Sequence, residues 1–189
     1  MSLDLTSLTD GELATLSCAG RQDAFAEIVR RHRDRMYRSA LASLGNPDDA
    51  LDVVQDAFIA AHRSLKRFDT TREMRPWLAR ITLNRCRDRL RNRRVLRFLM
   101  PFGAGGSPIE MIEDDQPRHD SATADKQELA QAMRAISKLP VAIREPLILR
   151  TIEGLSQAET AATLGITEKA VETRVRRGRQ SLRTELGRV

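Results

Sequence analysis

Residues 156–177 read SQAETAATLGITEKAVETRVRR, and their capping and turn residues predict two helices joined by a tight turn. Ser156 and Glu159 form the S-x-x-E pattern of a capping box, which opens the first helix. Gly165 suits the left-handed conformation of a tight turn, and Thr167 can cap the second helix. Val171 and the valine four residues later lie on one side of that helix and face inward. Together these features predict a helix-turn-helix.

A helix-turn-helix places the N-terminal part of its second helix in the major groove of DNA. The small side chain of Ala161 leaves room for the second helix to cross the first. The expected base contacts are Lys169, Glu172, Thr173 and Arg176, and the expected phosphate contacts are Arg174, Arg177 and Arg179. The alternative is a helical hairpin whose basic exterior meets only solvent.

An arginine-rich stretch, REMRPWLARITLNRCRDRLRNRR at residues 72–94, holds nine arginines against two acids. A helix is expected from near Pro76, because proline is well tolerated in a first turn. At 100° per residue, the stripe expected to pack is Ala79, Leu83, Cys86 and Leu90. The stripe expected to meet solvent or phosphate is Arg80, Asn84, Arg87 and Arg91. The only tryptophan, Trp77, lies off the apolar stripe and close to Ile81.

Two more helices are expected upstream. In residues 23–46 the apolar spacing predicts a buried face of Phe25, Ile28, Val29, His32, Met36, Ala40 and Leu44. In residues 47–68 the start PDD suits a helix N-terminus, and the predicted buried face is Leu51, Val54, Phe58, Ala61 and Leu65. The other side of this second helix presents Asp52, Gln55, Asp56 and Ile59. These residues form either a solvated face or a protein-binding surface, and an apolar isoleucine among acids favours the surface.

The composition is typical of small helical domains, and its charge indicates a polyanionic partner. The chain has 189 residues, a net charge of +6 and 4% aromatic residues. Arginine binds phosphate bidentately, so an excess of arginine favours nucleic acid. Neither a membrane span nor a signal peptide is visible, which predicts a cytoplasmic protein. Cys18 and Cys86 are expected to be reduced core residues, and no histidine has metal-ligand spacing, so no metal or cofactor is expected.

The composition and the periodicity of the chain change at about Phe98. Residues 98–125 carry three prolines, three glycines and six acids without a sustained helical period, which predicts a flexible linker. On both sides the apolar residues recur at helical spacing. The predicted fold class is therefore all-α, with two small helical domains at 1–97 and 126–189.

The order of these motifs resembles the bacterial extracytoplasmic-function (ECF) sigma factors, the subunits that direct RNA polymerase to promoters. DDALDVVQDAFIAA looks like region 2.2 of that family, and WLARITLNRCRDRLR looks like regions 2.3 to 2.4. LPVAIREPLILRTIEGLSQAETAATLGITEKAVETRVRRGRQSLR is similar to region 4. Leu51 departs from the family's DAEDVVQ run, where an acid usually stands, but leaves the Asp/Gln/Asp face intact.

The resemblance implies a fold with regions 2 and 4, and it implies partners. The residues it places against core RNA polymerase are Asp52, Gln55, Asp56 and Ile59. Those it places at the −10 promoter element, which is read and opened by residues 68–91, are Arg75, Trp77, Arg80, Asn84, Arg87 and Arg91. Those it places at the −35 element are Thr167, Lys169, Glu172, Thr173, Arg174, Arg176, Arg177 and Arg179. An anti-sigma factor is a further expected partner. Trp77 either wedges into the melted DNA or pins its helix to the preceding loop.

Two other classes of function remain open from the residues. A transcription regulator that binds an operator without polymerase would share the helix-turn-helix. A nuclease or recombinase would need a clustered carboxylate or nucleophile site, and the carboxylate pairs here lie on helix faces without one. Opening a duplex requires no bond chemistry, so the chain is not expected to be an enzyme.

Overall fold

The computed structural model describes residues 4–99 and 124–187, so the predicted linker lies almost wholly outside the described residues. Every regular element in the described part is a helix, which confirms the all-α class. The elements are η1 (Leu5–Ser7), α1 (Asp10–Cys18), α2 (Gln22–Leu44), α3 (Pro47–Ser64), η2 (Leu65–Arg67), α4 (Met74–Leu99), α5 (Ala124–Lys138), α6 (Val141–Thr151), α7 (Gln157–Leu164) and α8 (Glu168–Glu185). We refer to η1–α4 as the N-terminal half and to α5–α8 as the C-terminal half.

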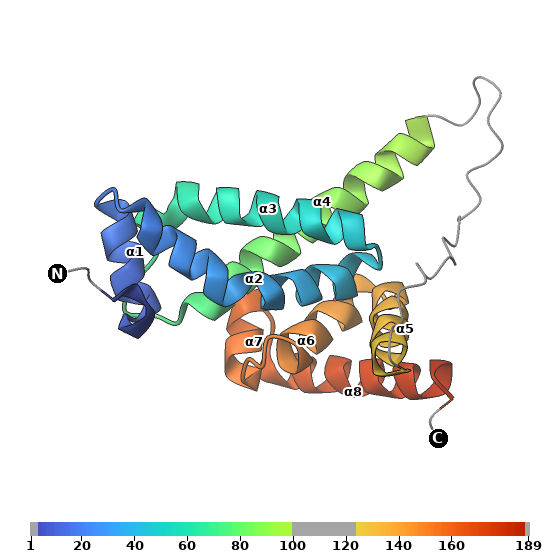
Figure 1. Cartoon of the computed structure of the whole chain (residues 1–189). Helices are drawn as coiled ribbons and strands as arrows, with labels where there is room; N and C mark the ends of the chain where they lie inside the picture. The colour runs from blue at the N-terminus through green and yellow to red at the C-terminus, as the bar shows by residue number, and fades with distance from the viewer. Residues whose placement is uncertain (1–3, 100–123, 188–189) are drawn as a thin grey trace.

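In the N-terminal half, α2, α3 and α4 pack around one apolar cluster (Figure 1). Gly45 ends α2 in the left-handed conformation, with φ 71°, and Asn46 caps α3 by accepting the backbone N–H of Asp49 over 2.9 Å. The predicted faces are largely confirmed. The buried members are Ile28, Met36, Ala40, Leu44, Val54, Phe58, Ala61 and Leu65.

Two predicted core residues are exposed instead. The side chain of Leu51 is 59% exposed, because the buried face of α3 is centred on Ala50, Ala57 and Ala61, whose small side chains let neighbouring helices approach closely. Leu51 follows Ala50 by 100° around the helix and so faces solvent. Cys18 is also exposed, in the last turn of α1, whereas Cys86 is buried as predicted.

The two halves pack against each other, with the C-terminal half beneath α2 and α4 (Figure 1). Ala42, Ala79 and Leu83 of the N-terminal half join the apolar cluster of the C-terminal half, which includes Leu147 and Ile148. Cys86 belongs instead to the cluster of its own half. The predicted apolar stripe of the arginine-rich helix is therefore shared between the halves.

The ends of α4 differ from the expected ones. The helix begins at Met74, two residues before Pro76, and it continues to Leu99, beyond the predicted start of the linker. Its middle is tied to α3 by Arg89, which donates from Nε and Nη2 to Oδ1 of the buried Asp49, over 2.9 and 2.7 Å. Asp49 thus acts in tertiary packing as well as at a helix N-terminus.

Candidate functional site

The helix-turn-helix has the predicted geometry. Ser156 and Glu159 exchange both hydrogen bonds of a capping box at the start of α7. Gly165 ends α7 with φ 65°, and the Thr167 side chain caps α8 by accepting the N–H of Ala170 over 3.2 Å. The inward valines of α8 are buried, so the outer face of that helix is fixed.

The predicted DNA-reading side chains of α8 lie on that outer face. The exposed ones are Thr167, Lys169, Glu172, Arg176, Arg177 and Arg179, and Thr173 and Arg174 are partly exposed. Five cations and one acid in this set make the face basic. The buried side of α8 approaches α6 closely at Gly178, where a Cβ atom would lie 3.1 Å from Cγ2 of Ile143.

The basic stripe of α4 is exposed as predicted, at Arg80, Asn84, Arg87 and Arg91. Its members also bond among themselves and to neighbours. Arg87 donates from Nη1 to Oδ1 of Asn84 over 3.0 Å, and Arg91 pairs with Asp88 over 2.6 Å. The packing stripe beside it is buried at Ala79, Leu83 and Cys86, while Leu90 is partly exposed.

Two of the predicted −10 contacts face the C-terminal half. Arg87 donates from Nε and Nη2 to the two carboxylate oxygens of Glu145, each over 2.5 Å, and Glu145 is buried. Arg75 is partly buried beside Gly154, and its Nε has no hydrogen-bond partner among the residues that the structure describes. These two guanidinium groups therefore line the seam between the halves.

A second carboxylate is buried in the same seam. Glu153, 2% exposed, accepts a hydrogen bond from Oγ of Ser39 over 2.6 Å, and its backbone carbonyl accepts from Nη1 of Arg35 over 3.2 Å. Burial raises the pKa of Glu153, and the hydrogen bond from Ser39 partly offsets that effect. The seam thus combines an apolar layer with two buried carboxylates and their hydrogen bonds.

Trp77 is partly buried and packs on the residue that precedes the loop. Its ring centroid lies 4.9 Å from that of Phe68, and both Trp77 and Ile81 pack against the N-terminal cluster. This contact matches the predicted anchor between helix start and loop. It leaves part of the indole accessible.

The predicted protein-binding patch on α3 is exposed, with Ile59 43% exposed among Asp52, Gln55 and Asp56. Asp52 also pairs with Arg89 over 3.1 Å. Beside the patch lies an open hollow of 460 Å³ between α2 and α3, whose apolar walls include Phe25, Val29 and Phe58. The hollow is also lined by His62 and Arg63, and an apolar hollow beside groups of both charges suits a protein partner.

Comparison with known proteins identifies the family. The family model for Sigma-70 region 2 matches residues 28–95, and that for Sigma-70, region 4 matches residues 129–182. The RNA polymerase sigma factor CnrH of Cupriavidus metallidurans is 42% identical over 178 residues, which is 92% of each chain. The ECF RNA polymerase sigma factor SigM of Mycobacterium tuberculosis is 34% identical, over 95% of this chain and 85% of that protein. The chain is an ECF sigma factor of the sigma-70 family.

Solved structures agree with this assignment. CnrH in complex with the cytosolic domain of CnrY superposes with a TM-score of 0.69 at 34% identity, covering 94% of this chain and 97% of that chain. RpoE of Bartonella quintana, in complex with the anti-sigma factor NepR, shares the fold at 22% identity, with a TM-score of 0.68 over 87% of this chain and 97% of that chain. As an ECF sigma factor, the protein is a regulatory subunit that binds core RNA polymerase and directs promoter-specific initiation of transcription.

Sequence reasoning missed three tertiary contacts of this sigma factor. Asp49 was expected only at a helix end, and Glu145 and Glu153 were not singled out. No local signal marks the last two, since their partners lie 58 and 114 residues away. Within the described ranges, no helix is long and apolar enough to cross a membrane, and no group of three or more His, Cys, Asp or Glu side chains could hold a metal ion.

Proposed function

We propose that this sigma factor contacts core polymerase with the α3 patch, reads and opens the −10 element with residues 68–73 and α4, and reads the −35 element with α8. The observation that carries the −35 role is the basic outer face of α8, fixed by two inward valines and a capped N-terminus. Side chains near the start of such a helix reach base edges, and those further along reach phosphates.

The −10 role is supported by the chemistry of α4. Opening a duplex requires neutralised phosphates beside the fork and a surface for an unstacked base. The exposed Arg80 and Arg91 supply positive charge, and Trp77 supplies a partly accessible aromatic ring at the start of the same helix. The contact between Trp77 and Phe68 supports the anchor role, and the accessible part of the ring is compatible with the wedge role as well.

Promoter binding on this proposal requires the halves to separate. The −35 and −10 elements lie about 25 base pairs apart, or roughly 85 Å at 3.4 Å per base pair. The longest element packed in the seam, α4, has 26 residues, a length of about 39 Å. Because α7 packs against α4 in this structure, the two DNA-reading helices are too close to reach both elements at once. Separation would also release Arg87 from Glu145.

Control by an anti-sigma factor in the cytoplasm is part of the proposal. Two matched sigma factors were solved in complexes, CnrH with CnrY and RpoE with the anti-sigma factor NepR. A partner that bound the α3 patch or covered α4 and α8 would block polymerase or promoter. The action of sigma factors on RNA polymerase favours a cytoplasmic location.

Transcription in vitro tests the proposed function. Core polymerase with the full chain is given a library of promoter fragments, and the transcripts are sequenced. We expect a subset of fragments that share a −35 and a −10 sequence to be transcribed, and core polymerase alone to transcribe none of them. Absence of any transcript above that background would refute the proposal. Specific duplex binding by the chain without polymerase would favour an operator-binding regulator instead.

A further inference from the structure

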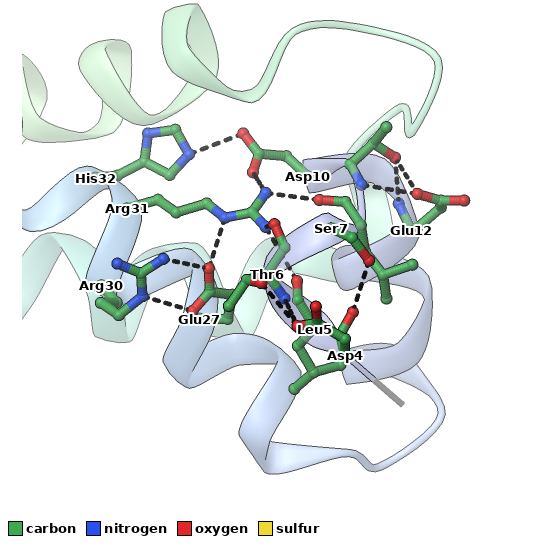
Figure 2. A network of polar contacts seen from close by, with 12 residues as sticks. Asp4, Leu5, Thr6, Ser7, Asp10, Glu12, Glu27, Arg30, Arg31 and His32 are labelled. Carbon is green, nitrogen blue, oxygen red and sulfur yellow. Dashed lines mark hydrogen bonds and ion pairs between the residues drawn. The ribbon is translucent and has the colours of Figure 1, made fainter. Parts of the chain in front are cut away.

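The segment of residues 4–18 precedes the family-model match at 28–95, and none of the roles above uses it. Besides the apolar core, the side chain of Arg31 of α2 binds this segment at four residues (Figure 2). Its Nη2 donates to the carbonyl oxygens of Leu5 and Thr6 over 3.0 and 2.9 Å. Its Nη1 donates to the carbonyl of Leu8 over 2.7 Å and to Oδ1 of Asp10 over 3.1 Å. Four of its five N–H groups are therefore bound to this one segment.

The fifth N–H of Arg31 is fixed by an acid on its own helix. Arg31 Nε donates to Oε1 of Glu27 over 2.8 Å, and the same carboxylate receives two hydrogen bonds from Arg30. Hydrogen bonds from Arg30 and then Arg31 lower the pKa of Glu27 to about 2. His32 adds a contact to the other carboxylate oxygen of Asp10 over 2.8 Å (Figure 2). The start of α1 is thus held at a set position on α2.

From that position, α1 lies against the backbone of the loop that leads into α4. A Cβ atom on Gly11, the second residue of α1, would lie 2.3 Å from the carbonyl oxygen of Thr70 and 3.3 Å from its carbonyl carbon. The obstacle is backbone, which cannot rotate away as a side chain can. Leu13 of α1 is buried in the same cluster as Phe68 and Met74, the residues on either side of the loop.

The loop itself is a formed turn with its side chains outside. Oδ1 of Asp69 accepts the N–H of Thr71 over 3.1 Å and its hydroxyl over 2.6 Å, and the carbonyl of Asp69 accepts the N–H of Arg72 over 3.0 Å. Residues 69–73 are all exposed. Because the hydrogen bonds of this turn are exposed to water, both its geometry and its placement depend on what it rests on.

We propose that Gly11 and Arg31 are positioning residues for the −10 element: they brace the loop 69–73 at the start of α4 without touching DNA. The inference rests on the proposed −10 role of the loop. A loop that is held in one place before DNA arrives loses less conformational entropy on binding and discriminates better between bases.

The test uses two variants with a matched control. Gly11→Ala is compatible with helix formation, because alanine favours a helix more than glycine does, but it forces the Thr70 carbonyl to move. Arg31→Ala removes the anchor. Arg30→Ala is the control, because Arg30 carries the same charge on the same helix and also bonds Glu27, but donates no hydrogen bond to residues 4–18.

The first readout is hydrogen exchange in the full chain alone. We expect the amides of Thr71 and Arg72 to exchange faster in Gly11→Ala and Arg31→Ala, with α8 unchanged and Arg30→Ala like the wild type. Unchanged exchange at both amides in both variants would overturn the brace. This readout does not depend on polymerase or on DNA.

The second readout is transcription by the reconstituted holoenzyme from the best promoter of the wild type and its single-base changes. We expect discrimination at −10 positions to fall about tenfold or more in the two brace variants, since a misplacement of 1 Å can cost on the order of 100-fold. Discrimination at −35 positions should not change. Equal losses at both elements, or an unchanged −10 preference despite faster loop exchange, would overturn the positioning role. A wild type that transcribes nothing would refute the proposed function and this role with it, while the exchange data would still report whether α1 holds the loop.

Discussion

Arg87 of α4 and Glu145 of α6 form a bidentate pair across the seam, with Nε and Nη2 each 2.5 Å from a carboxylate oxygen. Glu145 is almost fully buried, whereas the side chain of Arg87 is 45% exposed. A buried carboxylate without its partner is costly, but a half-exposed guanidinium can return to water. The pair therefore makes closure of the two halves sensitive to the charge at position 145.

Glu145→Gln should shift the chain toward a form with separated halves. The loss of a charged hydrogen-bonded pair with one exposed partner should cost the closed form about 1–2 kcal/mol. Closure can be followed by energy transfer between dyes on the exposed Cys18 and on Gln180→Cys in α8. Burial raises the pKa of Cys86 to about 12, so that thiol stays protonated and should not react with the dye.

Glu185→Gln is the matched control for that measurement, because Glu185 pairs with Lys138 within the C-terminal half over 3.2 Å. It removes the same charge without touching the seam. We expect lower transfer for Glu145→Gln only. The same transfer efficiency in both variants and the wild type would show that the pair does not hold the halves together.

Ionisation of the buried Glu153 should make the free energy of unfolding depend on pH, with a sign that follows from its raised pKa. Burial raises its pKa above the ordinary value of 4.5, so the folded chain keeps this proton to a higher pH than the unfolded chain. As the pH rises from 4.5 through the folded-state pKa, the unfolded chain ionises first and the free energy of unfolding falls. Glu153→Gln cannot ionise. In urea unfolding, its stability relative to the wild type should increase across this pH window and level off above it, and a difference independent of pH would contradict the assignment.

Trp77→Ala should destabilise the N-terminal half as well as impair promoter opening. The ring packs on Phe68 and on the N-terminal cluster, and loss of a partly buried aromatic ring should cost about 2–3 kcal/mol. Trp77→Phe keeps a ring at that position. We expect Phe to recover most of the stability, measured by urea unfolding, and opening to be measured separately by permanganate reactivity of the −10 thymines. A fully stable Trp77→Ala chain that fails to open DNA would assign the residue to the wedge role alone.

Asp56→Asn should weaken binding to core polymerase by about tenfold, as expected for loss of a charged contact worth about 1.4 kcal/mol. Asp56 is exposed on α3 beside Ile59, so the fold should not change. It is a cleaner probe than Asp52, which also pairs with Arg89. Asp34→Asn on α2 removes the same charge elsewhere on the surface. Affinity of labelled chain for core polymerase is the measurement, and equal affinities for the two variants would remove Asp56 from the interface.

Arg176→Ala should affect the −35 element selectively, if it contacts a base. Loss of a good base contact costs about 1–3 kcal/mol and relaxes preference at one position, whereas loss of a phosphate contact weakens all sequences alike and lowers the salt dependence. Arg179 follows the buried Gly178 and is expected to contact phosphate, so Arg179→Ala is the comparison variant. Transcription from −35 variants at two salt concentrations distinguishes the two behaviours. A uniform loss for Arg176→Ala would assign it to the phosphates.

Local signals were enough for much of this protein. Capping by Ser156 and Thr167, the left-handed Gly165 and the inward valines of α8 depend only on residues a few positions apart, and all have the predicted geometry. The exposed stripe of α4 and the exposed patch of α3 followed from a period of 3.6 residues. The roles of those faces in binding stay predictions.

Only the tertiary structure decided what each buried face meets. Helical periodicity shows that Ala79, Leu83 and Cys86 share a stripe, but their assignment to two different clusters depends on how the halves pack. Leu51 fitted the same periodicity and is exposed, because the buried face of α3 is centred on its alanines and Leu51 lies about 100° around the helix from Ala50. Glu145 and Glu153 look in the sequence like ordinary acids near an apolar helix. Their burial, and with it the pairing of Arg87, arises from contacts between residues far apart in the chain, which no local pattern encodes.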